Sequence, residues 1–220
     1  SLFNINKKDK IGIFEVGMDK KGEIDFLTKK IMPNVGVITN ISYAHIKNFQ
    51  NLKGIANAKS EIINNMPQHG SIILNADDNF FKFLKSKSKK KKLRIISFGI
   101  NKKSNVSLIN IKNRKFNSVI YIKNNEKKLK FIIKKNLENY IYNILSTLAV
   151  MSVYFDLEKL DKFFFNDYKF PEGRGDLNLI KLKEKKINLI DESYNSNPLS
   201  LQFAINKLNN LNTKSKKKLI

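Results

Sequence analysis

Hydrophobic and polar positions along the chain predict short strands that alternate with helices. Apolar runs typical of buried strands are separated by stretches whose apolar residues recur three and four positions apart, as on one face of a helix. The expected strands are 11–16, 35–39, 71–74, 94–98 and 187–190, and the expected helices are 24–31, 51–66, 79–84, 137–155, 157–164 and a last one that begins at 198. Three further segments, 106–111, 116–122 and 129–133, predict an antiparallel meander. The pattern indicates an α/β fold, with a largely parallel sheet flanked by helices.

A domain boundary is expected near 171–175, where a proline and two glycines interrupt the pattern. Beyond it, a strand, a strand and a helix are typical of the beginning of a second, Rossmann-like α/β unit. We therefore expect domains at 1–172 and 173–220. The chain ends in Lys218-Leu219-Ile220, which resembles the opening of a strand, and it begins without a start signal. It is expected to be a fragment of a longer protein.

Composition narrows the class of protein. A chain of 220 residues with 41% hydrophobic residues can bury a core, and it contains no uninterrupted apolar run of about 18 residues, so we expect no membrane insertion. No signal peptide is recognisable at the beginning of the chain. The absence of cysteine excludes disulfides and thiolate metal sites. These features favour a cytoplasmic protein.

The net charge of +23 raises the possibility of nucleic-acid binding. Arginine, which suits bidentate phosphate and guanine contacts, occurs only at positions 94, 114 and 174, and the lysines are mostly scattered. The run 89–92 is interpreted as a solvated loop. A basic nucleic-acid-binding module stays open as the alternative from another class, and it predicts strongly salt-dependent binding.

Three residues follow or interrupt the apolar patterns in ways that indicate chemistry. Glu15 ends the first expected strand on the same side as two isoleucines, and His45 follows the second strand, so both are expected at one edge of the sheet. Lys59 lies within the apolar stripe of the helix 51–66. The plainer alternatives are that Glu15 is an exposed carboxylate, that His45 is structural and that Lys59 extends to solvent. A carbamylated Lys59 would instead complete, with Glu15 and His45, a site for a hard cation such as Mg²⁺.

The polar segment 191–198 lies between an apolar strand and an amphipathic helix, where open α/β sheets bind ligands. A solvated turn is the plainer alternative. Pro198 suits the first position of the helix. Arg174, between two glycines, is either a hinge residue or a cation that neutralises a transferred phosphoryl group.

Taken in order, these motifs resemble the Mur ligase family over essentially the whole chain. The residues that carry the resemblance are Glu15-Val16-Gly17, Gly22-Glu23-Ile24, Thr39-Asn40-Ile41, Ala44-His45, Ala58-Lys59-Ser60-Glu61-Ile62, Asn75-Ala76-Asp77-Asp78, Gly173-Arg174-Gly175 and the segment 191–198. The last two are similar to those of the MurF type. The resemblance implies a central ATP-binding domain at 1–172 and the beginning of the C-terminal domain at 173–220.

The resemblance also implies an activity and its residues. It implies an ATP-dependent ligase of peptidoglycan synthesis, expected to be a monomer, that joins UDP-N-acetylmuramoyl-tripeptide to D-alanyl-D-alanine through an acyl phosphate. The roles implied are Mg²⁺ ligands for Glu15, His45 and a carbamylated Lys59, ATP phosphate contact for Arg174, ribose contact for Glu192, adenine contact for Asn143, and lining of the site for Asn195 and Asn197. Where the family commonly has histidine and asparagine, this chain has Asn139 and Tyr140.

One family motif is absent. The chain has no Gly-Lys pair, so it lacks the phosphate-binding loop G-x-x-x-x-G-K-[ST]. The resemblance implies that this loop precedes Ser1, together with a UDP-binding domain. The 220 residues alone are therefore expected to be inactive. Another Mur ligase, or a ligase similar to folylpolyglutamate synthase, stays open as the enzymatic alternative.

Overall fold

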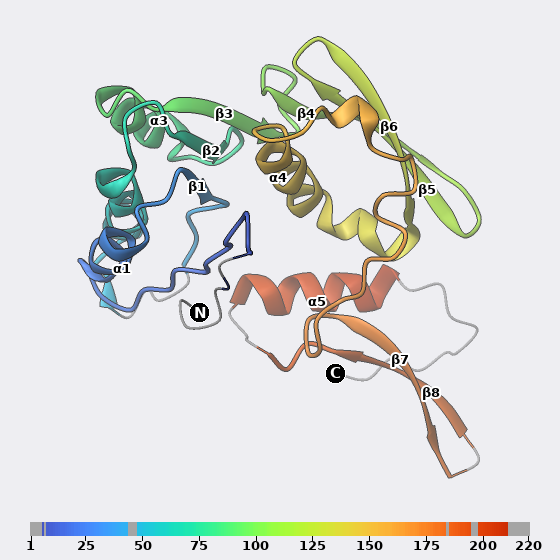
Figure 1. The fold of residues 1–220 in the computed structure, drawn as a ribbon. Helices are drawn as coiled ribbons and strands as arrows, with labels where there is room; N and C mark the ends of the chain where they lie inside the picture. The colour runs from blue at the N-terminus through green and yellow to red at the C-terminus, as the bar shows by residue number, and fades with distance from the viewer. Residues whose placement is uncertain (1–5, 7, 44–47, 184, 195–197, 211–220) are drawn as a thin grey trace. The chain divides into compact units, whose positions relative to one another are not determined.

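The computed structural model describes residues 6, 8–43, 48–183, 185–194 and 198–210, which form helices and two β-sheets (Figure 1). The elements in chain order are α1 Glu23–Ile31, β1 Val35–Ile38, α2 Leu52–Lys59, η3 Ser60–Asn65, β2 Ser71–Asn75, α3 Phe81–Lys90, β3 Arg94–Gly99, β4 Val106–Asn113, β5 Asn117–Asn124, β6 Lys127–Lys134, η4 Lys135–Tyr140, α4 Ile141–Met151, η5 Leu157–Lys159, β7 Asp176–Leu182, β8 Lys185–Asp191 and α5 Pro198–Asn210, where η denotes a 3-10 helix. The α/β class expected from the pattern is confirmed.

The larger sheet has six strands in the order β1-β2-β3-β4-β5-β6. The pairs β1–β2, β2–β3 and β3–β4 are parallel. The connections from β4 to β5 and from β5 to β6 are only three and two residues long, and so short a link can join only antiparallel neighbours. The meander expected from the sequence thus continues the parallel sheet instead of forming a sheet of its own. Strand β2 is buried along its apolar residues, as a parallel strand covered on both faces should be.

Two groups of buried apolar side chains pack the elements of the first unit together. One joins β1, β2, α3 and the 3-10 helix η3, and consists of Ile38, Ile63, Met66, Ile72, Leu74, Leu84 and Leu93. The other joins α1 to α2 and consists of Met18, Ile24, Ile55 and Ala58. Burial of such side chains contributes about 1.5–3 kcal/mol each, so these contacts fix the strand ends that carry the polar loops.

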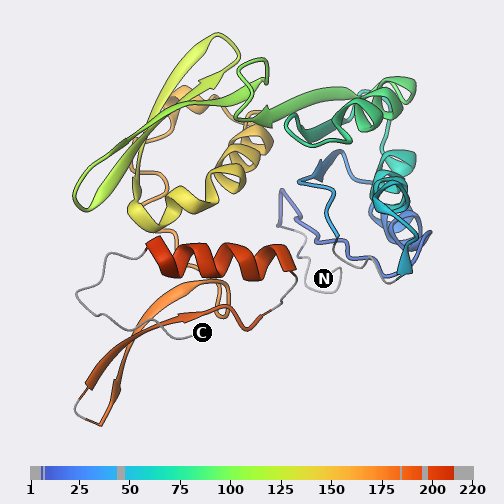
Figure 2. The same cartoon turned by 180° about the vertical axis from the view of Figure 1, so that it is seen from behind.

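The chain divides into two compact units. The first comprises 1–111, 120–130 and 141–160, and the second comprises 112–119, 131–140 and 161–220. The second unit contains β7 and β8, which pair antiparallel with Asp176 opposite Asp191. Both views show α5 beside this two-stranded ribbon (Figures 1 and 2).

Several expected elements differ from those observed. Residues 11–16 have no regular structure, and Ile13 is 91% exposed, so the buried strand expected there is wrong. A strand needs a hydrogen-bonded neighbour. In the described sheet β1 is the edge strand, and residues 11–16 do not pair with it. The expected helix 157–164 is reduced to η5, and α3 extends to Lys90, so the first half of the run 89–92 is helix and not loop.

The strand β8 also differs from its expectation. Its apolar run was expected to be buried, but Ile187 and Leu189 are 38% and 43% exposed. A two-stranded ribbon cannot cover both of its own faces, which accounts for the difference. The helix after it begins at Pro198, as expected.

Candidate functional site

Polar loops of the first unit meet at the carboxyl edge of the parallel strands. Because β1, β2 and β3 run in the same direction, the segments that follow them lie at one edge of the sheet. Asn75 Nδ2 donates to the Thr39 carbonyl oxygen at 3.1 Å. The Ile41 amide donates to Asp78 Oδ2 at 2.6 Å. The loop after β1 is thereby held against the loop after β2.

Asp77 ties the loop after β2 to the loop after β3 and to α4. Its carboxylate accepts hydrogen bonds from the Ile100 amide at 2.5 Å, the Asn101 amide at 3.1 Å and the Tyr142 hydroxyl at 3.1 Å. Burial and the nearby Asp77 raise the pKa of Tyr142, which keeps the phenol protonated as a donor. The next residue of α4 is the exposed Asn143, which is expected to contact adenine. Asn143 therefore directly follows Tyr142, whose side chain is anchored to this edge.

Lys59 is the last residue of α2, and its amine reaches the same edge. The half-buried side chain donates from Nζ to the Asn40 carbonyl oxygen at 2.8 Å. Burial lowers the pKa of Lys59, and the negative charge of Asp78 partly offsets that effect. A lysine with a lowered pKa has more neutral amine at a given pH, and the neutral amine is the form that can react with carbon dioxide.

The remaining expected metal ligands are not assembled in the structure as described. Glu15 is exposed, on the irregular segment 11–18, and His45 lies outside the described residues. Among the residues that are described, no group of three or more His, Cys, Asp or Glu side chains could hold a metal ion. The ligand roles of Glu15, His45 and Lys59 therefore stay predictions.

In the second unit, the Gly173-Arg174-Gly175 segment lies against the loop that follows β8. The Gly175 amide donates to the Asp191 carbonyl oxygen at 2.6 Å, and the Tyr194 amide donates to the Gly173 carbonyl oxygen at 3.1 Å. Gly173 has a φ of +71°, and a Cβ atom there would lie 2.9 Å from the Tyr194 amide nitrogen. Glycine is needed at this position because both the conformation and the close approach exclude a side chain.

The exposed Arg174 side chain lies on an aromatic ring. Its guanidinium carbon is 4.1 Å from the centre of the Tyr194 ring, within the range of a cation–π interaction. Within the same loop, hydrogen bonds from the Ser193 side chain and amide lower the pKa of Asp191. Arg174 and the segment that contains the half-buried Glu192 are thus neighbours, while their expected roles stay predictions. Asn195 and Asn197 lie outside the described residues.

Sequence patterns assigned no individual role to three residues that hold these loops, Asp77, Tyr142 and Tyr194. Asp77 and Tyr194 lay within the motif Asn75-Ala76-Asp77-Asp78 and the segment 191–198, but neither had a role of its own. Tyr142 follows no periodic signal, since it acts through one hydroxyl group, and its position beside Asn143 was the only available indication.

Comparisons with known proteins agree with this architecture. A family model described as the Mur ligase middle domain matches residues 1–151. A UDP-N-acetylmuramoyl-tripeptide–D-alanyl-D-alanine ligase of Buchnera aphidicola subsp. Baizongia pistaciae is 32% identical over 96% of this chain, which covers 45% of that relative. The chain therefore spans about half the length of such relatives.

Solved structures give the same picture. A crystal structure of MurF from Acinetobacter baumannii matches 96% of this chain and 45% of its own, with a TM-score of 0.83 and 25% identity. The structure of MurF ligase from Thermotoga maritima in complex with ADP matches 86% of this chain and 42% of its own, with a TM-score of 0.67 and 20% identity. The second likeness, at this low identity, concerns the fold alone.

Proposed function

Because the chain belongs to the Mur ligase family, we propose that the protein from which it comes joins UDP-N-acetylmuramoyl-tripeptide to D-alanyl-D-alanine at the expense of ATP. The 32% identity to a ligase of that name, over nearly the whole chain, is the observation that carries the proposal. We assign residues 1–172 to the central, ATP-binding domain and residues 173–220 to the beginning of the C-terminal domain. The match of the middle-domain model to residues 1–151 supports this division.

The reaction requires a carboxylate to be activated before an amine can attack it. The terminal carboxylate of the tripeptide takes the γ-phosphoryl group of ATP, which gives an acyl phosphate and ADP. The amine of D-alanyl-D-alanine then attacks the acyl carbon, the amide bond forms as the amine loses a proton, and phosphate leaves with the electron pair of the broken C–O bond. Negative charge gathers on the transferring phosphoryl group, so the enzyme must supply cations there.

Arg174 is our candidate for that cation. Its guanidinium is exposed, carries a permanent charge and matches phosphate oxygens with paired N–H donors. The adjacent Tyr194 ring packs against the guanidinium, and Gly173 permits the close approach of the Arg174 turn to Tyr194. We assign the ribose contact to Glu192, the adenine contact to Asn143, and a lining role to Asn195 and Asn197.

The metal proposal depends on Lys59. As an amine, Lys59 is no ligand for Mg²⁺, which prefers oxygen atoms. Once carbamylated it offers two carboxylate-like oxygens, and with Glu15 and His45 it forms a donor set that suits a hard divalent cation. Its lowered pKa and half-buried position support this assignment. Mg²⁺ bound there would neutralise phosphate charge.

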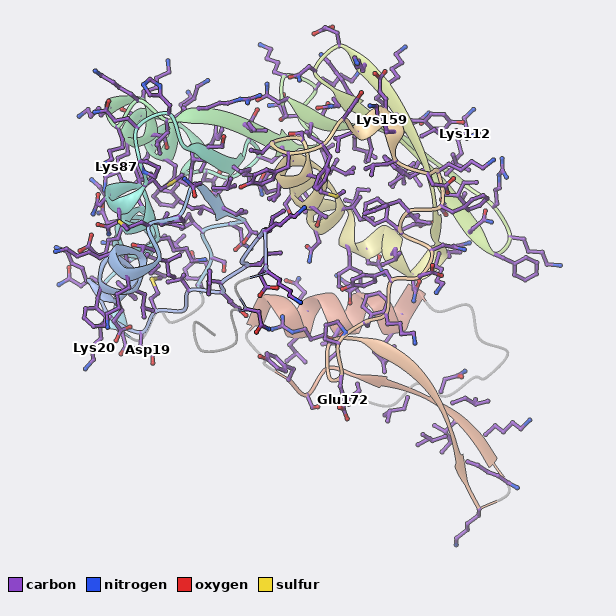
Figure 3. All side chains as sticks on the ribbon, in the orientation of Figure 1. Asp19, Lys20, Lys87, Lys112, Lys159 and Glu172 are labelled. Atoms are coloured by element: carbon purple, nitrogen blue, oxygen red, sulfur yellow. The ribbon has the colours of Figure 1, made fainter. Side chains whose placement is uncertain are left out.

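We further propose a cytoplasmic monomer that acts on soluble nucleotide-linked substrates. No helix in the described part of the chain is long and apolar enough to cross a membrane. The lysine side chains project from different elements, for example Lys20 before α1, Lys87 in α3 and Lys159 in η5 (Figure 3). This scatter favours an enzyme over the alternative of a nucleic-acid-binding module, which would gather them on one surface.

The full-length protein tests the proposal against its enzymatic alternatives. We expect phosphate release from ATP only when the UDP-linked tripeptide and D-alanyl-D-alanine are both present. Preference for a single amino acid would indicate another Mur ligase, and preference for glutamate on a folate would indicate a folylpolyglutamate synthase-like enzyme. Tight DNA or RNA binding that weakens steeply between two salt concentrations would instead support the nucleic-acid alternative.

A further inference from the structure

Three aromatic side chains of the second unit pack together just before the Arg174 turn. The ring centres of Tyr140 and Phe170 are 4.9 Å apart, and those of Tyr168 and Phe170 are 5.3 Å apart at an interplanar angle of 85°. Edge-to-face and tilted contacts at these distances are favourable. Phe170 thus occupies a fixed place between two tyrosines, one residue before Pro171.

The Arg174 main chain is held from two directions. Its amide donates to the Pro171 carbonyl oxygen at 3.1 Å, which closes a turn. Its carbonyl oxygen accepts a hydrogen bond from the Tyr140 hydroxyl at 3.3 Å. Burial, with smaller contributions from Glu192 and Tyr168, raises the pKa of Tyr140 to about 12. The phenol is therefore protonated at neutral pH and can act as the donor.

The Arg174 side chain is held separately, by the Tyr194 ring at 4.1 Å. Tyr194 is itself attached to the turn, because its amide donates to the Gly173 carbonyl oxygen. An arginine has many side-chain conformations, and each one away from the reacting phosphate is unproductive. The contacts of Tyr140 and Tyr194 together restrict both ends of this residue.

We propose that Tyr140 is a positioning residue for Arg174, through its hydroxyl to the Arg174 carbonyl oxygen and its ring against Phe170. The catalytic consequence rests on the proposed ligase function, in which Arg174 contacts the transferred phosphoryl group. In this proposal Tyr140 acts on the reaction through Arg174. Loss of its hydroxyl alone should therefore loosen Arg174 and slow phosphoryl transfer.

The first test compares variants of the full-length protein in steady-state ligation. We expect Tyr140→Phe to lower kcat about three- to tenfold, the scale of one lost hydrogen bond, and to leave the KM of the UDP-linked tripeptide unchanged. Arg174→Ala should lower kcat about 10²–10³-fold. In the Arg174→Ala background, Tyr140→Phe should have no further effect. Tyr154→Phe, at an exposed tyrosine whose ring faces Phe155, is the matched control and should behave as wild type.

The second test does not depend on catalysis. In full-length protein labelled with 15N-arginine, the Arg174 Nε–Hε signal, assigned by its loss in Arg174→Lys, should be displaced by the ring current of Tyr194. In Tyr140→Phe it should move toward its position in Tyr194→Leu. An unchanged signal, or an equal fall in kcat with and without Arg174, would overturn the proposal. If wild-type protein ligates nothing, the proposed function fails, and the NMR signal still decides the role of Tyr140.

Discussion

At the scale of single residues, Lys59 illustrates how position changes chemistry. Its amine is half-buried at the end of α2, 2.8 Å from the Asn40 carbonyl oxygen, and burial lowers its pKa from 10.5. The folded protein therefore releases the Lys59 proton at a lower pH than the unfolded chain does. Between the two pKa values the unfolded state binds more protons, so the contribution of Lys59 to stability rises with pH in that window.

The same lowered pKa leads to a prediction about carbamylation. In full-length protein supplied with 13C-bicarbonate, we expect a carbamate signal by 13C NMR that grows as the pH is raised toward the ordinary lysine value. The neutral amine attacks carbon dioxide, an N–C bond forms and a proton is released. Lys59→Gln should abolish this signal. The control Lys53→Gln, at an exposed lysine of the same helix, should retain it, and a signal that survives in Lys59→Gln would contradict the assignment.

Gly99 supplies a second prediction at this scale. A Cβ atom at position 99 would lie 2.5 Å from Asp77 Oδ2, the atom that accepts from Ile100 and Tyr142. We expect Gly99→Ala to lower the free energy of unfolding by about 1–3 kcal/mol, because the carboxylate cannot move without losing these bonds.

Urea denaturation of the full-length protein measures this loss. The KM for ATP should rise as well, because Asp77 anchors the helix that carries Asn143. Gly17→Ala, where an added Cβ meets nothing within 4 Å, should leave the free energy of unfolding unchanged. Equal stability of the two variants would show that the Asp77 contacts do not constrain position 99.

At the scale of elements, the beginning of α1 depends on a residue far away in the chain. Gly22, its N-cap, has a φ of +93° and offers no side chain to the free amides. Glu61 from η3 fills this role, since its buried carboxylate accepts from the Gly22 amide at 2.9 Å and from the Asp25 amide at 3.2 Å. A carboxylate at a helix N-terminus also interacts favourably with the positive end of the helix dipole.

We therefore expect Glu61→Ala to destabilise α1 by about 1.5–3 kcal/mol, the range for hydrogen bonds to a charged group. Hydrogen exchange of the α1 amides in the full-length protein should accelerate in the variant. Glu126→Ala is the control, because that side chain is 94% exposed and its pair with Lys123 spans 3.6 Å at the surface. Unchanged protection of α1 in Glu61→Ala would mean that the helix holds without this cap.

The 3-10 helix η3 begins at Ser60, and the bonds of this residue explain why the helix expected over 51–66 is observed as α2 followed by η3. Ser60 Oγ donates to the Asn57 carbonyl oxygen at 2.6 Å and accepts from Lys87 Nζ at 2.8 Å. Such local side-chain bonds compete with continued α-helical bonding. The apolar period predicted that a helix exists here, while the Ser60 bonds, one local and one to the distant Lys87, favour the change to a 3-10 helix.

At the scale of the whole molecule, the 220 residues include Arg174 and Lys59, the proposed phosphate contact and metal ligand, but no G-x-x-x-x-G-K-[ST] segment. We expect residues 1–220 alone to release no phosphate from ATP above background, and full-length protein under the same conditions to do so. Circular dichroism of the 220-residue protein checks that it is folded. Steady turnover by these residues alone would refute the prediction.

Sequence patterns alone predicted much of the secondary structure of this protein, and its family. Periodicity was sufficient for β1 to β3, the meander and α1, because each depends on short-range repetition of buried positions. The ordered motifs were sufficient to identify the family. The strand predicted over 11–16 is wrong because an apolar run becomes a strand only beside a hydrogen-bonded partner strand.

Only the tertiary structure decided which distant residues hold the loops and helix ends of each unit in place. The bonds from Asp77 to Tyr142, from Glu61 to Gly22 and from Tyr140 to Arg174 join residues separated by 34 to 65 positions. Each depends on one atom or one ring, so it leaves no period in the sequence. Repetition along the chain specifies which segments are buried, whereas single polar contacts between distant segments exist only after the chain has folded.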